Sequence, residues 1–146
     1  MKKRFMTPCA VGALIKRKSE NGNEEILLQK RKNGKWDLAV GGHVEESEPI
    51  TAALIRESYE EIGINVLYED IIFSTCSYTN FKDRPYTFFY FEIKKYSGIP
   101  YIKEPDKCFD LKWFALNNLP DNIIPDVKTV IASSVKGINF LELGWN

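Results

Sequence analysis

Three glutamates, Glu57, Glu60 and Glu61, have a spacing that would bring them together on one helix. They are spaced i, i+3 and i+4 within Pro49–Ile62, the clearest predicted helix, and therefore share one helical face. Like charges there repel, and the C-terminal half of a helix disfavours each anion by about 0.3–1 kcal/mol. Clustered carboxylate oxygens are the ligands that Mg²⁺ and Mn²⁺ prefer. The pattern indicates a divalent-metal site; a solvated acidic face is the simpler alternative.

The segment before this helix is also suited to a metal or a phosphate. Gly41-Gly42 ends the apolar run Trp36–Val40, and three further acids, Glu45, Glu46 and Glu48, follow it. A residue without a Cβ lets backbone groups approach a ligand closely, although adjacent glycines also mark simple turns. The order of strand, Gly-Gly, acidic loop and helix strengthens the functional interpretation.

These residues closely resemble the Nudix box of the MutT/Nudix hydrolases, which here spans the 23 residues Gly42–Ile64. The positions that match are Gly42, Glu48, Arg56, Glu57, Glu60, Glu61 and Gly63. The sequence departs from the family at Ser58, where an aliphatic residue is usual, and at Ser47, where glycine is common. Neither departure removes a ligand. The resemblance implies an α/β fold, an α/β/α sandwich around a mixed β-sheet, for a single domain over residues 1–146.

The resemblance also implies roles for individual residues. Glu57, Glu60 and Glu61 would be metal ligands, together with the backbone carbonyl of Gly41, while Glu48 would be a further ligand or a carboxylate supporting the ligands. Arg56 would orient the glutamates through charge-assisted hydrogen bonds. The general base would be Glu60 or Glu104, because residues 96–104 are similar to a region of MutT-type enzymes that supplies an additional carboxylate. The implied cofactor is Mg²⁺, with Mn²⁺ as a possible substitute.

Several further residues, one of them inside the box, are candidates for substrate binding. Arg31 lies close to where MutT-like enzymes place a phosphate-binding arginine, although it could also be a surface charge at a strand end. His43 could contact a phosphate or fill a turn. Four aromatic residues flank predicted loops and could stack on a base, namely Trp36, Tyr78, Phe81 and Tyr86.

The elements that must position these residues follow from apolar patterning and turn signals. Strands are predicted at Ala10–Ile15, Ile26–Gln29, Trp36–Val40, Ile71–Tyr78, Tyr86–Ile93 and Leu111–Leu116, with a hairpin signal at Asn21-Gly22 and a second helix at Pro125–Lys136. Along Tyr86–Ile93 one of two alternating aromatic pairs should be buried. Strands interleaved with two helices indicate an α/β domain with a mixed sheet.

Overall composition argues against several classes of partner. Twenty Lys and Arg balance twenty Asp and Glu, so wholesale binding to a nucleic acid polymer or an acidic membrane is not expected. The balance hides a net charge of +7 over residues 1–35 and of −5 over residues 42–64. Three cysteines without CxxC spacing are expected to be buried small hydrophobes, which favours a reducing cytoplasm. No signal peptide or membrane span is predicted.

The expected function is that of a Mg²⁺-dependent pyrophosphohydrolase, which converts a nucleoside triphosphate into a monophosphate and pyrophosphate by means of metal-activated water. The alternative substrates are ADP-ribose, a nucleoside diphosphate sugar or a dinucleotide polyphosphate. A non-catalytic nucleotide-binding regulator is the third possibility, disfavoured because all the glutamates are present. The expected partner is a small nucleotide, and the chain could be a monomer or a homodimer.

Overall fold

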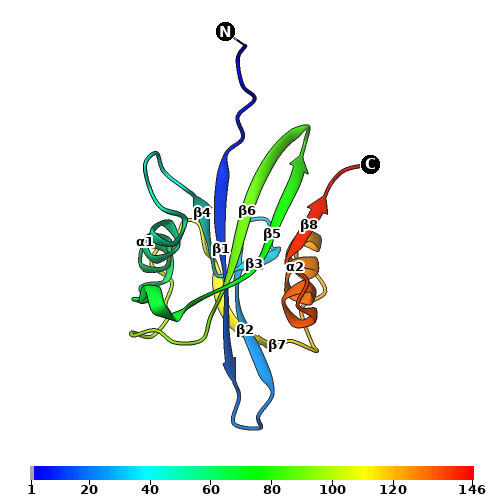
Figure 1. The fold of residues 1–146 in the computed structure, drawn as a ribbon. Helices are drawn as coiled ribbons and strands as arrows, with labels where there is room; N and C mark the ends of the chain where they lie inside the picture. Colours follow the sequence, from blue (N-terminus) through cyan, green and yellow to red (C-terminus); the bar gives the residue numbers. More distant parts are fainter. Residues whose placement is uncertain (1) are drawn as a thin grey trace.

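The computed structural model describes residues 2–146, in which eight strands form a mixed sheet between two helices (Figure 1). The strands are β1 (Cys9–Lys18), β2 (Glu24–Lys30), β3 (Trp36–Leu38), β4 (Val40–His43), β5 (Ile71–Phe81), β6 (Arg84–Ile93), β7 (Asp110–Ala115) and β8 (Phe140–Leu143). The helices are α1 (Ile50–Ile62) and α2 (Pro125–Lys136), and a 3₁₀ turn, η1, covers Tyr68–Asp70. Helix α1 covers one face of the sheet and α2 the other (Figure 1).

Strand β1 pairs with three other strands, with β4 and β6 over its first part and with β2 at its end. The main path runs β3-β2-β1-β6-β5-β8, and β4 pairs with β1 while β7 pairs with β2. Residues 10–13 of β1 pair with β4, whereas residues 16–18 pair with β2. The pairs β1–β6 and β5–β8 are parallel and the others antiparallel, which confirms the mixed sheet.

Two apolar clusters hold the helices to the sheet. Under α1, Leu54 and Ile62 pack with Val40 and other residues of the strands. Under α2, Val130 and Ile131 pack with a second set of strand residues. Successive side chains of a strand point to opposite faces, so β1 supplies both clusters. These layers confirm the α/β/α sandwich.

Helix α1 has well-defined ends. Pro49 is its N-cap, so the helix begins one residue later than predicted. Gly63 ends it in the left-handed conformation (φ 71°), as its type suggests. The buried Ser58 hydroxyl donates a hydrogen bond to the Leu54 carbonyl at 2.7 Å, so this departure from the family pattern leaves no unpaired polar group. In the part of the chain that the structure describes, no helix is long and apolar enough to span a membrane.

The structure corrects three details of the sequence prediction. The segment Trp36–Val40 forms two strands rather than one, because β3 pairs with β2 and β4 pairs with β1. Strand β8 was not predicted. Of the cysteines, Cys108 is buried as expected, but Cys9 and Cys76 are partly exposed.

Candidate active site

Four of the five glutamates predicted as metal ligands or catalytic groups line one cavity of about 390 Å³, which we call the carboxylate pocket. Glu57, Glu60 and Glu61 come from α1, and Glu104 comes from the loop between β6 and β7. The other lining residues are Arg31, Gly41, Gly42, His43, Glu45 and Lys107. Residues that are far apart in the sequence therefore meet here.

Glycine at position 42 allows a carboxylate of α1 to approach β4 closely, and the backbone at position 41 binds a second one. The Gly41 backbone N–H donates a hydrogen bond to Oε2 of Glu61 at 2.8 Å. A Cβ at residue 42 would lie 2.6 Å from each carboxylate oxygen of Glu57, closer than real Cβ contacts. The close approach of the Glu57 carboxylate to β4 is therefore a physical reason for glycine at position 42.

Arg56 lies among the carboxylates and binds several of them. Its Nε and Nη2 contact the two oxygens of Glu48 at 2.8 and 3.0 Å, a bidentate pair. Its Nη1 contacts Glu57 at 2.7 Å and Glu60 at 3.2 Å, and Nη2 also donates to the His43 carbonyl at 3.1 Å. This geometry suits the orienting role predicted for Arg56.

Glu48 is engaged with Arg56 rather than lining the carboxylate pocket. The hydrogen bond from Arg56, and a second from the Glu45 backbone N–H, lower the pKa of Glu48 to about 2. The turn that brings Glu48 back requires Ser47 to adopt a left-handed backbone, with φ of 63°. Glycine adopts this conformation without strain, which explains why it is common at this position in the family.

Burial and neighbouring negative charges raise the pKa values of two carboxylates in the pocket. Partial burial, reinforced by the charges of Glu57 and Glu104, raises the pKa of Glu61 to about 8, against the opposing effects of the Gly41 N–H and Arg31. Burial also raises the pKa of Glu57. A cation placed among these carboxylates would relieve both costs.

The donor set fits a hard divalent cation in its chemical type. Carboxylate oxygens from two elements surround one cavity, and oxygen is the ligand atom that Mg²⁺ selects. Between residues 2 and 146, no three His, Cys, Asp or Glu side chains converge closely enough to hold an ion as they stand. Arg56 binds Glu57 and Glu60, so ligation would require these two carboxylates to move away from Arg56 and closer to the other carboxylates within the pocket.

Backbone hydrogen bonds deliver Glu104 to the pocket. The Tyr101 N–H donates to the Ile62 carbonyl at 3.1 Å, and the Lys103 N–H donates to the Glu61 carbonyl at 3.4 Å. These bonds satisfy carbonyl groups in the last turn of α1. The Tyr101 ring packs on Gly63, where a Cβ would collide with it. The loop is therefore docked on the same helix that carries the other glutamates.

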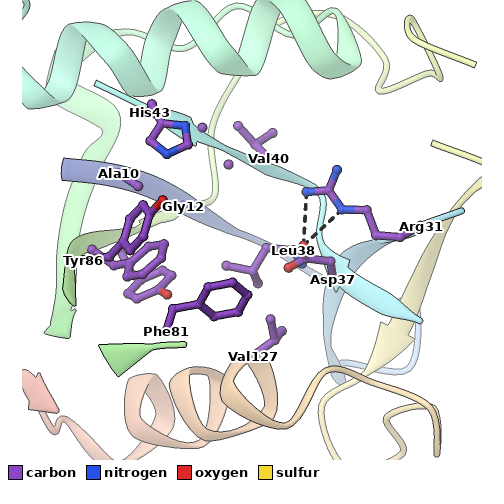
Figure 2. A pocket seen from close by; sticks show the side chains of 14 residues that line it. Ala10, Gly12, Arg31, Asp37, Leu38, Val40, His43, Phe81, Tyr86 and Val127 are labelled. Atoms are coloured by element: carbon purple, nitrogen blue, oxygen red, sulfur yellow. Dashed lines mark hydrogen bonds and ion pairs between the residues drawn. The ribbon is translucent and has the colours of Figure 1, made fainter. Parts of the chain in front are cut away.

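A second cavity, of about 430 Å³, adjoins the first and is mainly apolar; we call it the aromatic pocket (Figure 2). Tyr86, Phe88 and Tyr90 form a stacked ladder along one face of β6, with successive ring centroids 5.8 Å apart. Gly12 of β1 makes room for the ladder, because a Cβ there would lie 2.8 Å from the Tyr90 ring. Phe81, Leu38 and Val127 are among the other lining residues. The size and lining suit a flat organic ring.

Four residues line both pockets and so form their shared boundary: Arg31, Gly41, Gly42 and His43. Nε and Nη2 of Arg31 each lie 3.1 Å from one oxygen of Asp37, and Figure 2 shows the two side chains facing each other at the side of the aromatic pocket. The His43 ring lies 5.8 Å from that of Tyr86. Asp37 was missed by the sequence analysis, since a lone aspartate beside a tryptophan carries no motif.

The aromatic candidates for base stacking separate into two groups. Phe81 and Tyr86 line the aromatic pocket. Trp36 is instead buried in the core under α2, edge-on to Phe114 at 4.8 Å. Tyr78 is covered by Trp145, with parallel rings 5.4 Å apart, and does not line the pocket.

Comparison with known proteins supports the resemblance. The NUDIX domain family model matches residues 6–133. A protein of Bacillus subtilis (strain 168), whose name assigns it provisionally as an 8-oxo-dGTP diphosphatase, is 31% identical over 112 residues, which cover 76% of this chain and 71% of that protein.

Solved structures share the fold. The crystal structure of a MutT NUDIX hydrolase from Burkholderia pseudomallei is 28% identical, with a TM-score of 0.77, and the match covers 88% of this chain and 98% of that one. An Ap4A hydrolase from C. elegans is 20% identical, with a TM-score of 0.69 and coverage of 89% and 96%, which shows a common fold. The matched residues include the whole segment Gly42–Ile64. The chain therefore belongs to the Nudix family and is a hydrolase that acts on phosphoanhydrides.

Proposed function

We propose that this protein is a Mg²⁺-dependent nucleoside triphosphate pyrophosphohydrolase that releases a nucleoside monophosphate and pyrophosphate. The observation that carries the proposal is the shared boundary between the two pockets. A base stacked in the aromatic pocket would have its phosphates directed across Arg31 and the two glycines toward the carboxylates. The aromatic pocket, at about 430 Å³, suits one nucleoside.

The chain's residues divide the work as follows. Glu57, Glu60 and Glu61, with the carbonyl of Gly41, would hold Mg²⁺ or Mn²⁺. A bound ion supplies charge neutralisation at the phosphate oxygens and lowers the pKa of an attacking water. Arg56, itself held by Glu48, orients the glutamates.

Water adds to phosphorus as the bridging P–O bond breaks, and a carboxylate accepts the water's proton. Glu60 and Glu104 are the candidates for this general base. Arg31 binds a phosphate oxygen pair in the manner of a bidentate guanidinium, and His43 lies beside it at the pocket boundary. Phe81 contacts the base; the position of Tyr78 under Trp145 argues against direct substrate contact by that residue.

Similarity supports a triphosphate substrate of the MutT kind. The Bacillus subtilis relative is named for action on 8-oxo-dGTP, and the Burkholderia pseudomallei hydrolase is named MutT. We therefore propose ordinary or modified purine nucleoside triphosphates as the first compounds to test. We place the enzyme in the cytoplasm as a monomer or homodimer that acts on small molecules.

A substrate panel with and without Mg²⁺ tests the proposal. Phosphorus NMR of the products should show pyrophosphate and a nucleoside monophosphate, formed only with the metal present. Two phosphomonoesters from ADP-ribose, a nucleoside diphosphate sugar or a dinucleotide polyphosphate would contradict it in favour of that substrate class. Nucleotide binding without turnover would indicate a regulator.

A further inference from the structure

The outer wall of the aromatic pocket is carried by a hairpin that projects beyond its neighbours. Phe81 ends β5, Tyr86 lies near the start of β6, and their rings meet edge to face at 6.5 Å. Strand β1 pairs with β6 only from Thr87 onward, and β8 pairs with β5 only as far as Thr79. Within residues 80–86 the strand pairs are Asn80–Pro85 and Phe81–Arg84, with no third strand from the described residues beside them, and a two-stranded hairpin is marginally stable by itself.

The chain's last residues contact this hairpin after leaving β8. In Figure 1 the segment that follows β8 runs on toward the hairpin end of the sheet. The Asn80 side-chain amide donates a hydrogen bond to the Gly144 carbonyl at 3.2 Å. Gly144 has φ of 76° and lies against the Asn80 backbone, where a Cβ would collide. The chain therefore continues along β5 beyond the end of the regular β5–β8 pairing.

Trp145 adds two contacts with Tyr78 of β5. Its indole Nε1–H donates to the Tyr78 carbonyl at 3.0 Å, and its ring stacks on the Tyr78 ring with an interplanar angle of 16°. Side chains alternate along a strand, so Tyr78 and Asn80 lie on the face of β5 opposite Phe81. Trp145 thus packs on β5 immediately before residues 80–86, on the face opposite the aromatic pocket, and does not line that pocket.

We propose that Trp145 is a positioning residue for substrate binding: by bracing the β5–β6 hairpin, it holds Phe81 and Tyr86 in place as the outer wall of the aromatic pocket. The bracing stands on the contacts above, and its effect on substrate rests on the proposed function. Trp145 acts through the hairpin, so its loss should weaken nucleotide binding while the chemistry at the glutamates continues.

Hydrogen exchange tests the bracing without any substrate. In ligand-free Trp145→Ala, backbone amides of residues 80–86 should exchange about tenfold faster than in the wild type. The variant loses a stacked aromatic pair and a hydrogen bond, and the loss of contacts of this kind raises the population of the open, exchanging state by about that factor. Phe140→Ala is the matched control, since it removes an exposed aromatic from β8 without touching the hairpin. Unchanged exchange in Trp145→Ala, or equal acceleration in Phe140→Ala, would overturn the proposal.

Steady-state kinetics with dGTP and Mg²⁺ test the consequence. Trp145→Ala should raise KM about fivefold with kcat within about twofold, since binding and chemistry lie on different elements. Trp145→Phe keeps a ring for stacking but loses the N–H donor, so it should restore part of the KM. With Phe81→Ala already present, Trp145→Ala should raise KM much less, because the two residues act through one wall.

The two arms separate this proposal from the proposed function. Faster hairpin exchange with unchanged KM in an active enzyme would refute the positioning role. A lower kcat at unchanged KM would also refute it, since the defect would then lie at the glutamates. If the wild-type chain hydrolyses no nucleotide, the proposed function fails, and the exchange experiment still decides whether Trp145 braces the hairpin.

Discussion

The Glu57 carboxylate fills the space in which a Cβ of residue 42 would lie, with both of its oxygens 2.6 Å from that point. Gly42→Ala should therefore displace Glu57 from the carboxylate pocket. We expect kcat to fall about 100-fold, the loss typical of misplacing a catalytic group by about 1 Å. Circular dichroism should show an intact fold. Turnover within a few-fold of the wild type would show that the position of Glu57 is not critical.

Replacing individual glutamates by glutamine should distinguish those that act as metal ligand or general base from those that have no role in turnover. Glu60→Gln should lower kcat by at least about 100-fold, as expected for loss of a ligand or general base, while the fold survives because Glu60 is exposed. Glu104→Gln should match that loss if Glu104 is the general base. Glu46→Gln, an exposed glutamate outside the pocket, is the control. Near-normal turnover of Glu60→Gln would contradict its assignment.

Asp37 binds Arg31 at the boundary between the two pockets. Measuring KM for variants of each residue tests their proposed roles in substrate binding. Arg31→Lys loses the planar guanidinium that we propose binds a phosphate oxygen pair, and it should raise KM about tenfold. Asp37→Asn keeps the shape but releases the guanidinium and should raise KM about threefold for all bases alike. A change in base preference would show instead that Asp37 contacts the base. Lys32→Ala removes an adjacent exposed charge and should have no effect.

Divalent cations should stabilise the protein through the carboxylate pocket. A ligand that binds only the folded state adds about 2.7 kcal/mol at 100 times its Kd, so millimolar Mg²⁺ should raise Tm by several degrees. Glu57→Gln should abolish most of that increase, and Glu46→Gln should retain it. Differential scanning calorimetry with and without Mg²⁺ makes the comparison, and an unchanged wild-type Tm would argue against the metal site.

A buried ion pair away from the active site should make stability depend on pH. Lys16, buried in β1, donates to Glu92 of β6 at 3.0 Å and to Ser134 of α2. Burial raises the pKa of Glu92, but the hydrogen bonds and charges of Lys16 and Lys94 outweigh it and leave the pKa below its usual value. The pair therefore stabilises the fold above pH 4.5, and this stabilisation is lost as pH falls further and the carboxylate is protonated.

Glu92→Gln should accordingly lower the free energy of unfolding by about 1–3 kcal/mol at neutral pH, because it leaves Lys16 without its partner charge. Urea titrations between pH 3 and 7 measure the difference from the wild type. The difference should shrink on acidification below pH 4.5. Glu69→Gln, at an exposed position in η1, should show no such trend, and a constant difference for Glu92→Gln would contradict the pKa direction.

The sequence patterns predicted those helices and strands whose formation depends on neighbouring residues. The helix carrying Glu57, Glu60 and Glu61 and most strands follow from periodicity and turn residues. The break at Ala39 does not, because β3 pairs with the preceding strand β2 whereas β4 pairs with β1, which is more distant in the sequence. Strand β8 depends on parallel pairing with β5, and the covering of Tyr78 depends on a residue 67 positions away. Neither leaves a local signal.

Glu104 illustrates the same limit within the site. Resemblance pointed to the residue, but its place beside α1 depends on backbone groups of Tyr101 and Lys103 that any sequence could offer. The pairing of Arg31 with Asp37 likewise follows from adjacent strands, since Asp37 faces Gln29, two residues before Arg31. Contacts that depend on backbone hydrogen bonds or on strand pairing cannot be predicted from residue types alone.

The separation of the two pockets onto different elements has an evolutionary consequence. The proposed hydrolytic groups lie on α1 and its docked loop, whereas much of the wall of the aromatic pocket belongs to the hairpin, β1 and α2. Substitutions at positions such as Phe81 or Val127 can reshape the ring cavity without altering the acidic cluster. A protein with this architecture can therefore change its substrate specificity through substitutions at a few positions while its acidic residues stay the same.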